Sequence, residues 1–362
     1  MKILYSPAHQ DHHPPFEIFD GGEKVANFEV PQRAERIRAA LEATGWAEIS
    51  ATADFGLEPI RAIHDADYLR FLETAFEEWL GQEGEGDDDY TKVELLPATF
   101  PPAGWRRRPE SLLGRAGYYM MDLSAPIVAG TYPAALAAAN CALSAAQAVA
   151  GGSPAAFALC RPPGHHAGRE NCGGYCYINN AAVAANWLSP PVTAGPGSHG
   201  RAALLDVDYH AANGTQDIFY ERGDVLTISI HADPAHEYPY FCGYADETGA
   251  GTGAGRHRNL PLPIGSDDAA YLAALEEALR LIRQFGAATL VVSIGMDIYE
   301  ADPLGKFRVT RRGIREIGSR IAGLGLPSVI VMEGGYNNEA LGENVVAMLE
   351  PFASQGQEIS RP

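Results

Sequence analysis

A short apolar run that ends abruptly in acids and a histidine constrains this chain more than any other feature. The run covers residues 202–205, and two carboxylates and one imidazole follow it at alternate positions, Asp206, Asp208 and His210. An apolar run of this length predicts a buried parallel strand whose polar residues begin where the sheet ends. Because side chains alternate along an extended chain, these three should leave one face of the strand together.

Two acids and an imidazole in one small volume favour a bound cation. Closely packed carboxylates repel each other in a low-dielectric site, and a cation relieves that repulsion. Asp208 and His210 are therefore predicted to be metal ligands, with the Asp206 carboxylate behind them. The alternative is a strand end whose acids cap the following helix. This segment alone does not distinguish the two.

The same arrangement, an apolar run followed by polar residues, recurs at four more places in the chain. The runs are residues 155–160, 225–230, 288–294 and 329–332, and the polar residues after them are His165-His166, His231, Asp297 and Glu333 with Tyr336. Helices are predicted between the runs over residues 132–150, 267–285 and 310–324, with Ser266 as the N-cap of the second. Strands that alternate with helices predict a mainly parallel sheet in a three-layer αβα arrangement. In such sheets the ligand site lies beyond the carboxyl ends of the strands, where all these polar residues fall.

Length and composition bear on the domain organisation. The chain has 362 residues and no visible internal repeat, so we expect one domain over residues 1–362, although this length also allows two ordinary domains. Residues 81–109 form a loop insertion that is acidic and rich in glycine and proline, and that ends in Trp105 and three arginines. Ordering so long an irregular segment alone is costly. We therefore expect it to pack against a second subunit in a homodimer or higher homo-oligomer.

The charge balance and the cysteines indicate partners and compartment. The formal net charge of −19 repels nucleic acid and anionic membranes at long range and favours a cationic or neutral substrate. The apolar stretch at residues 1–6 is too short for a signal peptide, and we expect no bilayer-spanning run and a soluble cytoplasmic protein. The 5 cysteines are an odd number without a CxxC pair, which predicts reduced thiols.

A catalytic zinc ion is the metal that this pattern suits best. Zinc in enzymes commonly takes three protein ligands and keeps one position for water. Asp208 and His210 supply two ligands, and Asp297, which follows a wholly apolar strand, is predicted to be the third. Zinc lowers the pKa of water to about 7 and polarises a carbonyl group, and both effects suit amide hydrolysis.

The remaining polar residues at strand ends can supply the rest of such chemistry. His165-His166 can perform acid and base catalysis, and Asp206 can fix the tautomer of His165. Tyr336, which follows two glycines, can donate its hydroxyl to a developing oxyanion. A lone histidine or tyrosine near a strand end is more often a satisfied structural group. Their joint occurrence at successive strand ends favours catalysis instead.

Taken together, these motifs resemble the zinc-dependent histone deacetylase family. The resemblance is closest to its bacterial acetylpolyamine amidohydrolases and histone deacetylase-like amidohydrolases, and it covers essentially the full length. The motifs that carry it are residues 161–167, 173–176, 206–210 and 213–217, together with Asp297 and residues 333–336.

The resemblance implies a fold and a set of residue roles. The fold is the arginase/deacetylase α/β fold, and the zinc ligands are Asp208, His210 and Asp297. The implied catalytic residues are His165 and His166 as the acid/base pair, Asp206 and Asn213 as their partners, and Tyr336 as the oxyanion-polarising hydroxyl. A structural potassium ion is also implied, held partly through carbonyl groups by Asp206, Asp208, His210, Ser229 and Ile230.

The substrate site is expected to be a tunnel. The resemblance implies that Tyr175 forms one of its walls, and the neighbouring Gly174 allows close backbone approach. Asp122, together with Glu110, is expected near the tunnel mouth, where an acid favours a cationic or neutral amine.

Two departures from the family pattern bear on these expectations. Ala211-Ala212 stands where the family usually has His-Gly, so we expect the metal site to persist with repacking beneath it. Leu113 and Ser124 stand where polyamine-selective relatives carry glutamates that attract the distant ammonium groups of the substrate. Loss of these carboxylates predicts weaker discrimination in favour of polyamines.

The expected function is that of a zinc-dependent amidohydrolase, which removes acetyl or short acyl groups from small amines, polyamines or acetyl-lysine. One alternative is an arginase-like dimanganese ureohydrolase, which needs further carboxylates around a second metal. Another is a non-catalytic acyl-lysine-binding protein, against which His165, His166 and Tyr336 argue.

Overall fold

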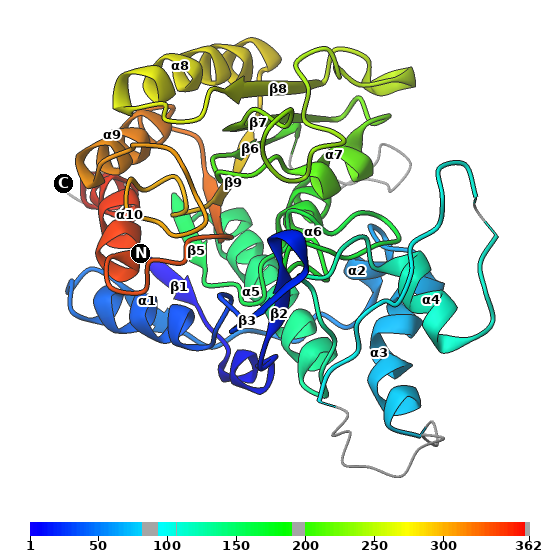
Figure 1. The fold of residues 1–362 in the computed structure, drawn as a ribbon. Helices are drawn as coiled ribbons and strands as arrows, with labels where there is room; N and C mark the ends of the chain where they lie inside the picture. Colours follow the sequence, from blue (N-terminus) through cyan, green and yellow to red (C-terminus); the bar gives the residue numbers. More distant parts are fainter. Residues whose placement is uncertain (82–92, 106, 190–199, 359–362) are drawn as a thin grey trace.

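A single parallel sheet organises the protein. The computed structural model describes residues 1–81, 93–105, 107–189 and 200–358, and within them eight strands form this sheet (Figure 1). The strand order is β4-β1-β5-β10-β9-β6-β7-β8, and each neighbouring pair runs parallel, as predicted. The strands are β1 (Lys2–Leu4), β4 (Glu48–Ser50), β5 (Ala155–Ala158), β6 (Ala202–Asp206), β7 (Val225–Ala232), β8 (His257–Leu262), β9 (Thr289–Ile294) and β10 (Ser328–Met332).

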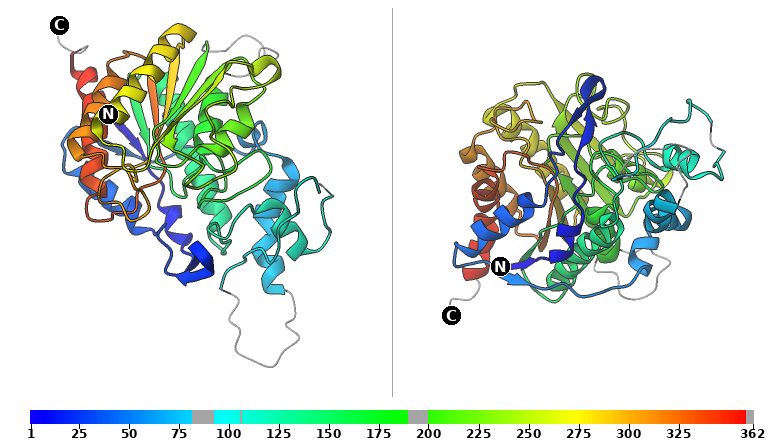
Figure 2. Two further views of the ribbon diagram at one scale, coloured as in Figure 1. Left: turned by 45° about the horizontal axis from the view of Figure 1, so that its top comes forward. Right: turned by 60° about the horizontal axis from the view of Figure 1, so that its bottom comes forward.

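Helices cover both faces of the sheet (Figure 2, left view). One layer contains α1 (Gln32–Glu42), α8 (Asp268–Phe285), α9 (Arg311–Ala322) and α10 (Leu341–Glu358). The other contains α2 (Glu58–Arg61), α3 (Ala66–Gly81), α4 (Leu112–Tyr119), α5 (Thr131–Ala150) and α6 (Asn180–Leu188). Along β6, Ala203 and Leu205 join the core under the first layer, and Leu204 joins the core under the second. The apolar residues of the strand are therefore divided between two cores, which gives it its continuous apolar sequence.

Smaller elements complete the fold. A short antiparallel hairpin of β2 (Glu17–Phe19) and β3 (Glu23–Val25) lies apart from the main sheet. The helix α7 (Asn213–Phe219) lies between β6 and β7 in the sequence. Short 3-10 turns include residues Pro7–Asp11, directly after the first strand.

Helix α5 bears on the expectation that no run spans a bilayer. By length and composition alone, its 20 residues are apolar enough to cross a membrane. In the structure, however, α5 packs against α6, β5 and β10, and twelve of its side chains are buried. Such a buried helix belongs to the core of the fold, and its alanines allow the close approach to the sheet.

The N-cap of α8 was wrongly predicted. Asp267, not Ser266, occupies the cap position, and its side chain accepts a hydrogen bond from the Ala270 amide at 3.0 Å. The Ser266 hydroxyl instead donates to the Pro263 carbonyl at 2.7 Å. Both residue types favour N-caps, so only the course of the backbone decides between neighbours. Besides the five apolar runs, residues 1–8 are predicted to form a strand, which β1 confirms, whereas β4 and β8, at the two edges of the sheet, were not predicted.

The central four strands position the functional residues. In the strand order, β5, β10, β9 and β6 are direct neighbours. They are the strands followed by His165-His166, Tyr336, Asp297 and Asp208 with His210. Because all four run parallel, the segments after them meet at one edge of the sheet, although His165 and Tyr336 lie 171 residues apart in the chain.

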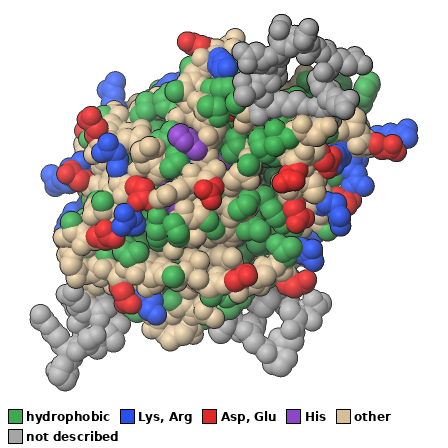
Figure 3. Space-filling model, turned by 90° about the horizontal axis from the view of Figure 1, so that it is seen from below, with side chains coloured by type: hydrophobic (Ala, Val, Ile, Leu, Met, Phe, Trp, Pro, Cys, Tyr) green, Lys and Arg blue, Asp and Glu red, His purple; other side chains and the backbone are tan. Residues whose placement is uncertain are grey.

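Much of the predicted loop insertion at 81–109 lies outside the described residues, which omit 82–92 and 106. Of the described part, Leu95 pairs with Ile127, while Val93, Phe100 and Trp105 are exposed. On the molecular face seen from below, acidic and basic side chains are interspersed among hydrophobic ones (Figure 3).

Candidate active site

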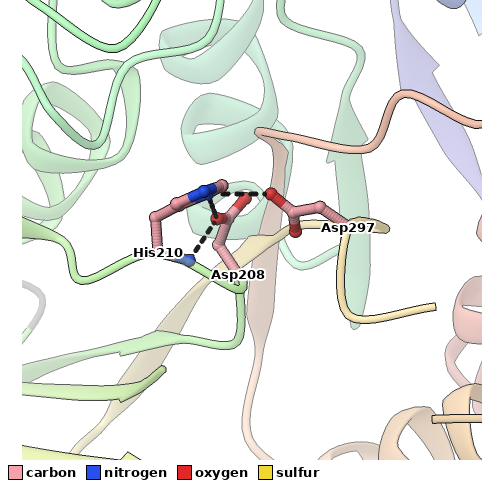
Figure 4. A group of neighbouring side chains, drawn as sticks. All are labelled: Asp208, His210 and Asp297. Atoms are coloured by element: carbon pink, nitrogen blue, oxygen red, sulfur yellow. Dashed lines mark hydrogen bonds and ion pairs between the residues drawn. The ribbon is translucent and has the colours of Figure 1, made fainter. Parts of the chain in front are cut away.

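The three predicted metal ligands lie together beyond the sheet edge. Asp208 and His210 follow β6, and Asp297 follows the neighbouring β9 (Figure 4). One ligand atom from each residue lies within 4.8 Å of the other two. His210 Nδ1 is 3.1 Å from Asp297 Oδ2 and 3.3 Å from Asp208 Oδ1. The three side chains therefore converge on a volume that one ion can fill.

Backbone groups hold these carboxylates in place. The Gly334 amide donates to Asp208 Oδ2 at 2.9 Å, and the Tyr209 amide donates to Asp297 Oδ1 at 3.0 Å. Glycine is required beside them: a Cβ atom on Gly295 would lie 2.0 Å from Asp208 Oδ2. A Cβ atom on Gly334 would lie 2.4 Å from Asp297 Oδ2. The ligand positions are thus set before any ion binds.

The electrostatics of this group fit a divalent cation. Asp208 and Asp297 are fully buried, and burial together with the Asp208 charge raises the pKa of Asp297 to about 7. Burial disfavours charged His210, but its hydrogen bonds to Asp208 and Asp297 outweigh this and raise its pKa to about 9. Without a cation, a proton on His210 offsets part of the negative charge. Two carboxylates and one imidazole are a donor set that zinc accepts, so the residues fit the implied metal.

His165 lies between two of the acids. Its Nδ1 is 3.1 Å from Asp206 Oδ2, and its Nε2 is 3.7 Å from Asp208 Oδ1. Burial alone would lower the pKa of His165, but the charges of Asp208 and Asp206 outweigh burial and raise it to about 10. The structure therefore brings Asp206 behind His165, as the sequence predicts. The two carboxylates favour the charged form of the His165 imidazole.

His166 has the opposite electrostatic environment. Its Nδ1 lies 2.6 Å from Asn213 Oδ1, at the start of α7. Burial, and then the positive charges of His165 and His210, lower the pKa of His166 well below its ordinary value. The two adjacent imidazoles, with ring centroids 4.0 Å apart, therefore have pKa values shifted in opposite directions, which favours the charged form of His165 and the neutral form of His166.

Tyr336 is held by a network that the sequence did not reveal. Its amide donates to Asp302 Oδ2 at 2.6 Å. The buried Arg33, on α1, donates to the carbonyls of Gly335 and Glu333 at 2.7 Å each, and its guanidinium lies 4.8 Å from the centre of the Tyr336 ring. Burial raises the pKa of Tyr336 well above its ordinary value, which outweighs the opposing effect of Arg33. Its hydroxyl therefore remains a hydrogen-bond donor.

Glu333 connects three of the strand ends. Its Oε2 accepts hydrogen bonds from the amides of Gly164 and His165 at 2.7 and 3.1 Å. Its Oε1 accepts from the Ser293 hydroxyl at 3.0 Å. Glu333 was predicted only as one of the polar residues after a strand, and the contacts show that it fixes the backbone that carries His165.

Two tyrosines contact different members of this group. The Tyr175 ring lies 5.5 Å from that of Tyr336, and its hydroxyl is hydrogen-bonded to the buried Glu17 of β2. The Tyr238 ring lies 4.9 Å from His166 and 6.0 Å from His210. Tyr238 was not predicted, because it follows no strand directly and no motif marks it.

The predicted substrate residues Asp122 and Gly174 lie against these tyrosines. The Gly174 amide donates to Asp122 Oδ2 at 2.8 Å, and the Tyr238 hydroxyl donates to the same oxygen at 2.6 Å. A Cβ atom on Gly174 would lie 2.2 Å from the His166 ring. Asp122 is therefore engaged by protein groups, which differs from the expected free acid at the tunnel mouth.

The predicted potassium residues lie beneath the metal ligands. Ser229 is the register partner of Asp206 on the neighbouring strand, and its hydroxyl lies 2.7 Å from His231 Nδ1. Ile230 is buried in the core under the first helix layer. Beside the departure at Ala211, a Cβ atom on Gly243 would meet the Ala211 side chain at 2.6 Å. The segment at Gly243 therefore packs closely against the substituted position.

The two positions that lack glutamates differ in their surroundings. Leu113 lies on α4 with 41% of its surface exposed. The amide and hydroxyl of Ser124 both donate to Asp122 Oδ1 at 3.0 Å. Ser124 thus supports Asp122 and offers no charge of its own.

Comparison with known proteins gives consistent matches over nearly the whole chain. The family model described as histone deacetylase domain matches residues 27–351. Acetylpolyamine amidohydrolase 2 of Pseudomonas aeruginosa is 45% identical over 353 residues, covering 97% of this chain and 98% of that protein. The acetylpolyamine amidohydrolase of Mycoplana ramosa is 43% identical over 354 residues, covering 98% and 100%. The crystal structure of acetylpolyamine aminohydrolase from Burkholderia pseudomallei matches with a TM-score of 0.90 and 42% identity, covering 98% of this chain and 99% of that one.

Stabilisation by zinc should increase with pH. A metal must displace protons held by His210, with a pKa of about 9, and by Asp297, with a pKa of about 7. Both protons are held more firmly at pH 6 than at pH 8, so zinc binds less tightly at pH 6. The free energy of zinc binding should become more favourable by about 1.4 kcal/mol per pH unit for each displaced proton. We therefore expect the rise in unfolding temperature on adding zinc to metal-free protein to be larger at pH 8 than at pH 6.

Calorimetry at the two pH values, with and without zinc, measures this rise directly. Asp297→Asn is the matched control, because it keeps the volume of the side chain and removes one charged ligand, so most of the rise should disappear. A larger rise at pH 6 than at pH 8 would contradict the assignment of these residues as metal ligands.

Proposed function

Since the chain belongs to the histone deacetylase family, we propose that it is a zinc-dependent amidohydrolase that removes acetyl or short acyl groups from small amines, acetylated polyamines among them. The observation that carries the proposal is the convergence of Asp208, His210 and Asp297 with a charged and a neutral histidine and a protonated tyrosine. The printed names of the similar proteins, acetylpolyamine amidohydrolases, support amide hydrolysis and an amine product.

The residues divide the work of hydrolysis. A zinc ion on Asp208, His210 and Asp297 would polarise the amide carbonyl and lower the pKa of a water molecule. Neutral His166, oriented by Asn213, accepts a proton from the attacking water and returns it to the leaving amine. His165, held by Asp206, completes the acid/base pair, and the hydroxyl of Tyr336 stabilises the negative charge that develops on the carbonyl oxygen.

The alternatives have less support. Among the described residues, Asp208, His210 and Asp297 form the one group of three or more potential ligands, so a dimanganese ureohydrolase lacks donors for its second metal. A non-catalytic acyl-lysine binder would not need the charge difference between His165 and His166.

Further parts of the proposal rest on fewer observations. A structural potassium ion beside Asp206 and Ser229, using carbonyl groups such as that of Ile230, is supported by the register of β6 and β7. A single domain is supported by the one parallel sheet shared by both helix layers. The absence of nucleic-acid and membrane partners is supported by the net charge of −19, and a cytoplasmic location is supported by the five free cysteines.

Substrate range is tested with a panel of acetylated amines on the zinc-loaded enzyme. We expect activity on acetylputrescine, acetylcadaverine and acetylspermidine, an acetyl-lysine peptide and a trifluoroacetyl-lysine reporter. Because Leu113 and Ser124 offer no carboxylate, no polyamine should be strongly preferred. A kcat/KM preference of about a hundredfold for any acetylpolyamine over the peptide would show that other residues supply the missing charges. Arginine cleavage with two manganese ions per chain would contradict the proposed function itself.

Replacing Tyr336 with phenylalanine should reduce kcat by about a hundred- to a thousandfold, because one donor to the oxyanion is lost. The ring remains beside Arg33, so zinc content and unfolding temperature should match those of the wild type. Equal turnover of an acetyl-lysine reporter by the two proteins would remove Tyr336 from the mechanism.

Deletion of residues 83–105 tests the proposed oligomer. Residues 83–92 of this segment lie outside the described residues, and the exposed Val93, Phe100 and Trp105 in the described part support an apolar interface. We expect the full chain to be a homodimer or larger by light scattering, and the deletion variant to be a monomer with an altered substrate range. A variant that stays dimeric would show that the contact between subunits lies elsewhere.

A further inference from the structure

One carboxylate joins the two aromatic walls of the active site. We propose that Asp122 is a positioning residue that fixes Tyr238 and the Gly174–Tyr175 turn relative to each other, and that this selects amines whose nitrogen carries an unbranched carbon chain. This inference rests on the proposed amide hydrolysis, and it concerns the shape of the channel above the metal ligands.

The joint depends on a single oxygen atom. Asp122 Oδ2 accepts hydrogen bonds from the Gly174 amide at 2.8 Å and from the Tyr238 hydroxyl at 2.6 Å. Gly174 and Tyr238 are 64 residues apart in the sequence, and they come from the segments before α6 and after β7. Loss of this oxygen would remove both hydrogen bonds, and with them the link through Asp122 between the Gly174 segment and the Tyr238 segment.

The carboxylate itself is held firmly. Its other oxygen, Oδ1, accepts from both the amide and the hydroxyl of Ser124 at 3.0 Å. The preceding Met121 amide donates to the Cys172 carbonyl at 2.8 Å, which fixes the backbone next to Gly173. A Cβ atom on Gly173 would lie 2.5 Å from Met121 and 2.7 Å from Asp122, so the segments are in close contact. Rotation of the carboxylate would break four hydrogen bonds.

Both walls touch the residues assigned to the chemistry. The Tyr238 ring is perpendicular to that of His166, at 4.9 Å between centroids, and lies 6.0 Å from His210. Gly174 lies against the imidazole ring of His166. The ring of the next residue, Tyr175, lies 5.5 Å from that of Tyr336. When the amide group of a substrate lies beside His166 and Tyr336, the first carbon atom of its amine part, which is bonded to the amide nitrogen, lies between these two walls.

A tyrosine fixed in this way excludes volume more strictly than a phenylalanine at the same position. The ring is only partly buried, so packing alone does not hold it, and its hydrogen bond to a charged carboxylate is of the stronger kind. Displacement of the Tyr238 ring would open space beside the first carbon of the amine. A branch on that carbon would otherwise collide with the ring. Linear substrates would then lose some contact, and branched ones would gain access.

Two variants separate this role from general stability. Tyr238→Phe keeps the ring and removes one hydrogen bond, and Asp122→Asn keeps the side-chain volume but leaves one oxygen to serve four donors. The substrates are acetylputrescine and an analogue with one methyl group on the carbon bonded to the amide nitrogen. We expect kcat/KM for acetylputrescine to fall about tenfold in each variant, mainly through KM. The preference of the wild type for the linear substrate should fall by at least about fivefold.

The matched control is Tyr5→Phe, which removes an equivalent 2.6 Å bond from a tyrosine to a carboxylate, Glu35. The side chains that Tyr5 contacts are those of His9, Glu35 and Arg38, so the preference for the linear substrate should not change. If Tyr238→Phe and Asp122→Asn keep the wild-type preference and KM, Asp122 does not position the walls and the inference is wrong. If the wild type hydrolyses neither substrate, the proposed function fails as well. The two failures are therefore distinguishable.

Discussion

Two carboxylates without access to water, Asp208 and Asp297, are the physical constraint around which the site is arranged. Burial, and then their mutual repulsion, raise the pKa of Asp297, and the carboxylates beside His165 and His210 raise the pKa values of these histidines. Two glycines, Gly295 and Gly334, leave the space that the acids occupy. The site is costly to form without a cation, because burial of like charges is unfavourable. A divalent ion would remove this cost, so these residues suit a metal site better than a second structural ion pair.

Adjacent histidines with different protonation states follow from the same constraint. His165 faces two carboxylates, while His166 faces an amide oxygen of Asn213 and two positive imidazoles. Neighbours of one sequence motif therefore lie in different electrostatic environments, and the proposed mechanism assigns the proton transfer from water to His166. Beneath them, the buried Arg33 is paired with Glu29 at 2.7 Å and holds the segment that carries Tyr336. Charge is thus balanced locally in each part of the site.

The sequence predicted what depends on local pattern. Apolar runs that end in polar residues identified five strands of the sheet and their parallel arrangement, which the structure confirms. The structure also brings Asp208, His210 and Asp297 together. Contacts that depend on distant backbone were not predictable. Arg33 looks like a surface residue of a charged helix, and Tyr238 follows no strand directly. The N-cap of α8 was assigned to Ser266 because two adjacent residues were equally suitable and only the backbone distinguishes them.

The place of β10 in the sheet has a consequence for the order in which the protein can fold during synthesis. This strand is the last to leave the ribosome, yet it lies in the middle, between β5 and β9. Without β10, the other strands fall into two groups that do not pair with each other, β4-β1-β5 and β9-β6-β7-β8, and each group leaves an unpaired edge where β10 belongs. Gly334, whose amide holds Asp208, arrives with the same segment. The contacts that hold the Asp208 carboxylate are therefore complete only when β10 has joined the sheet.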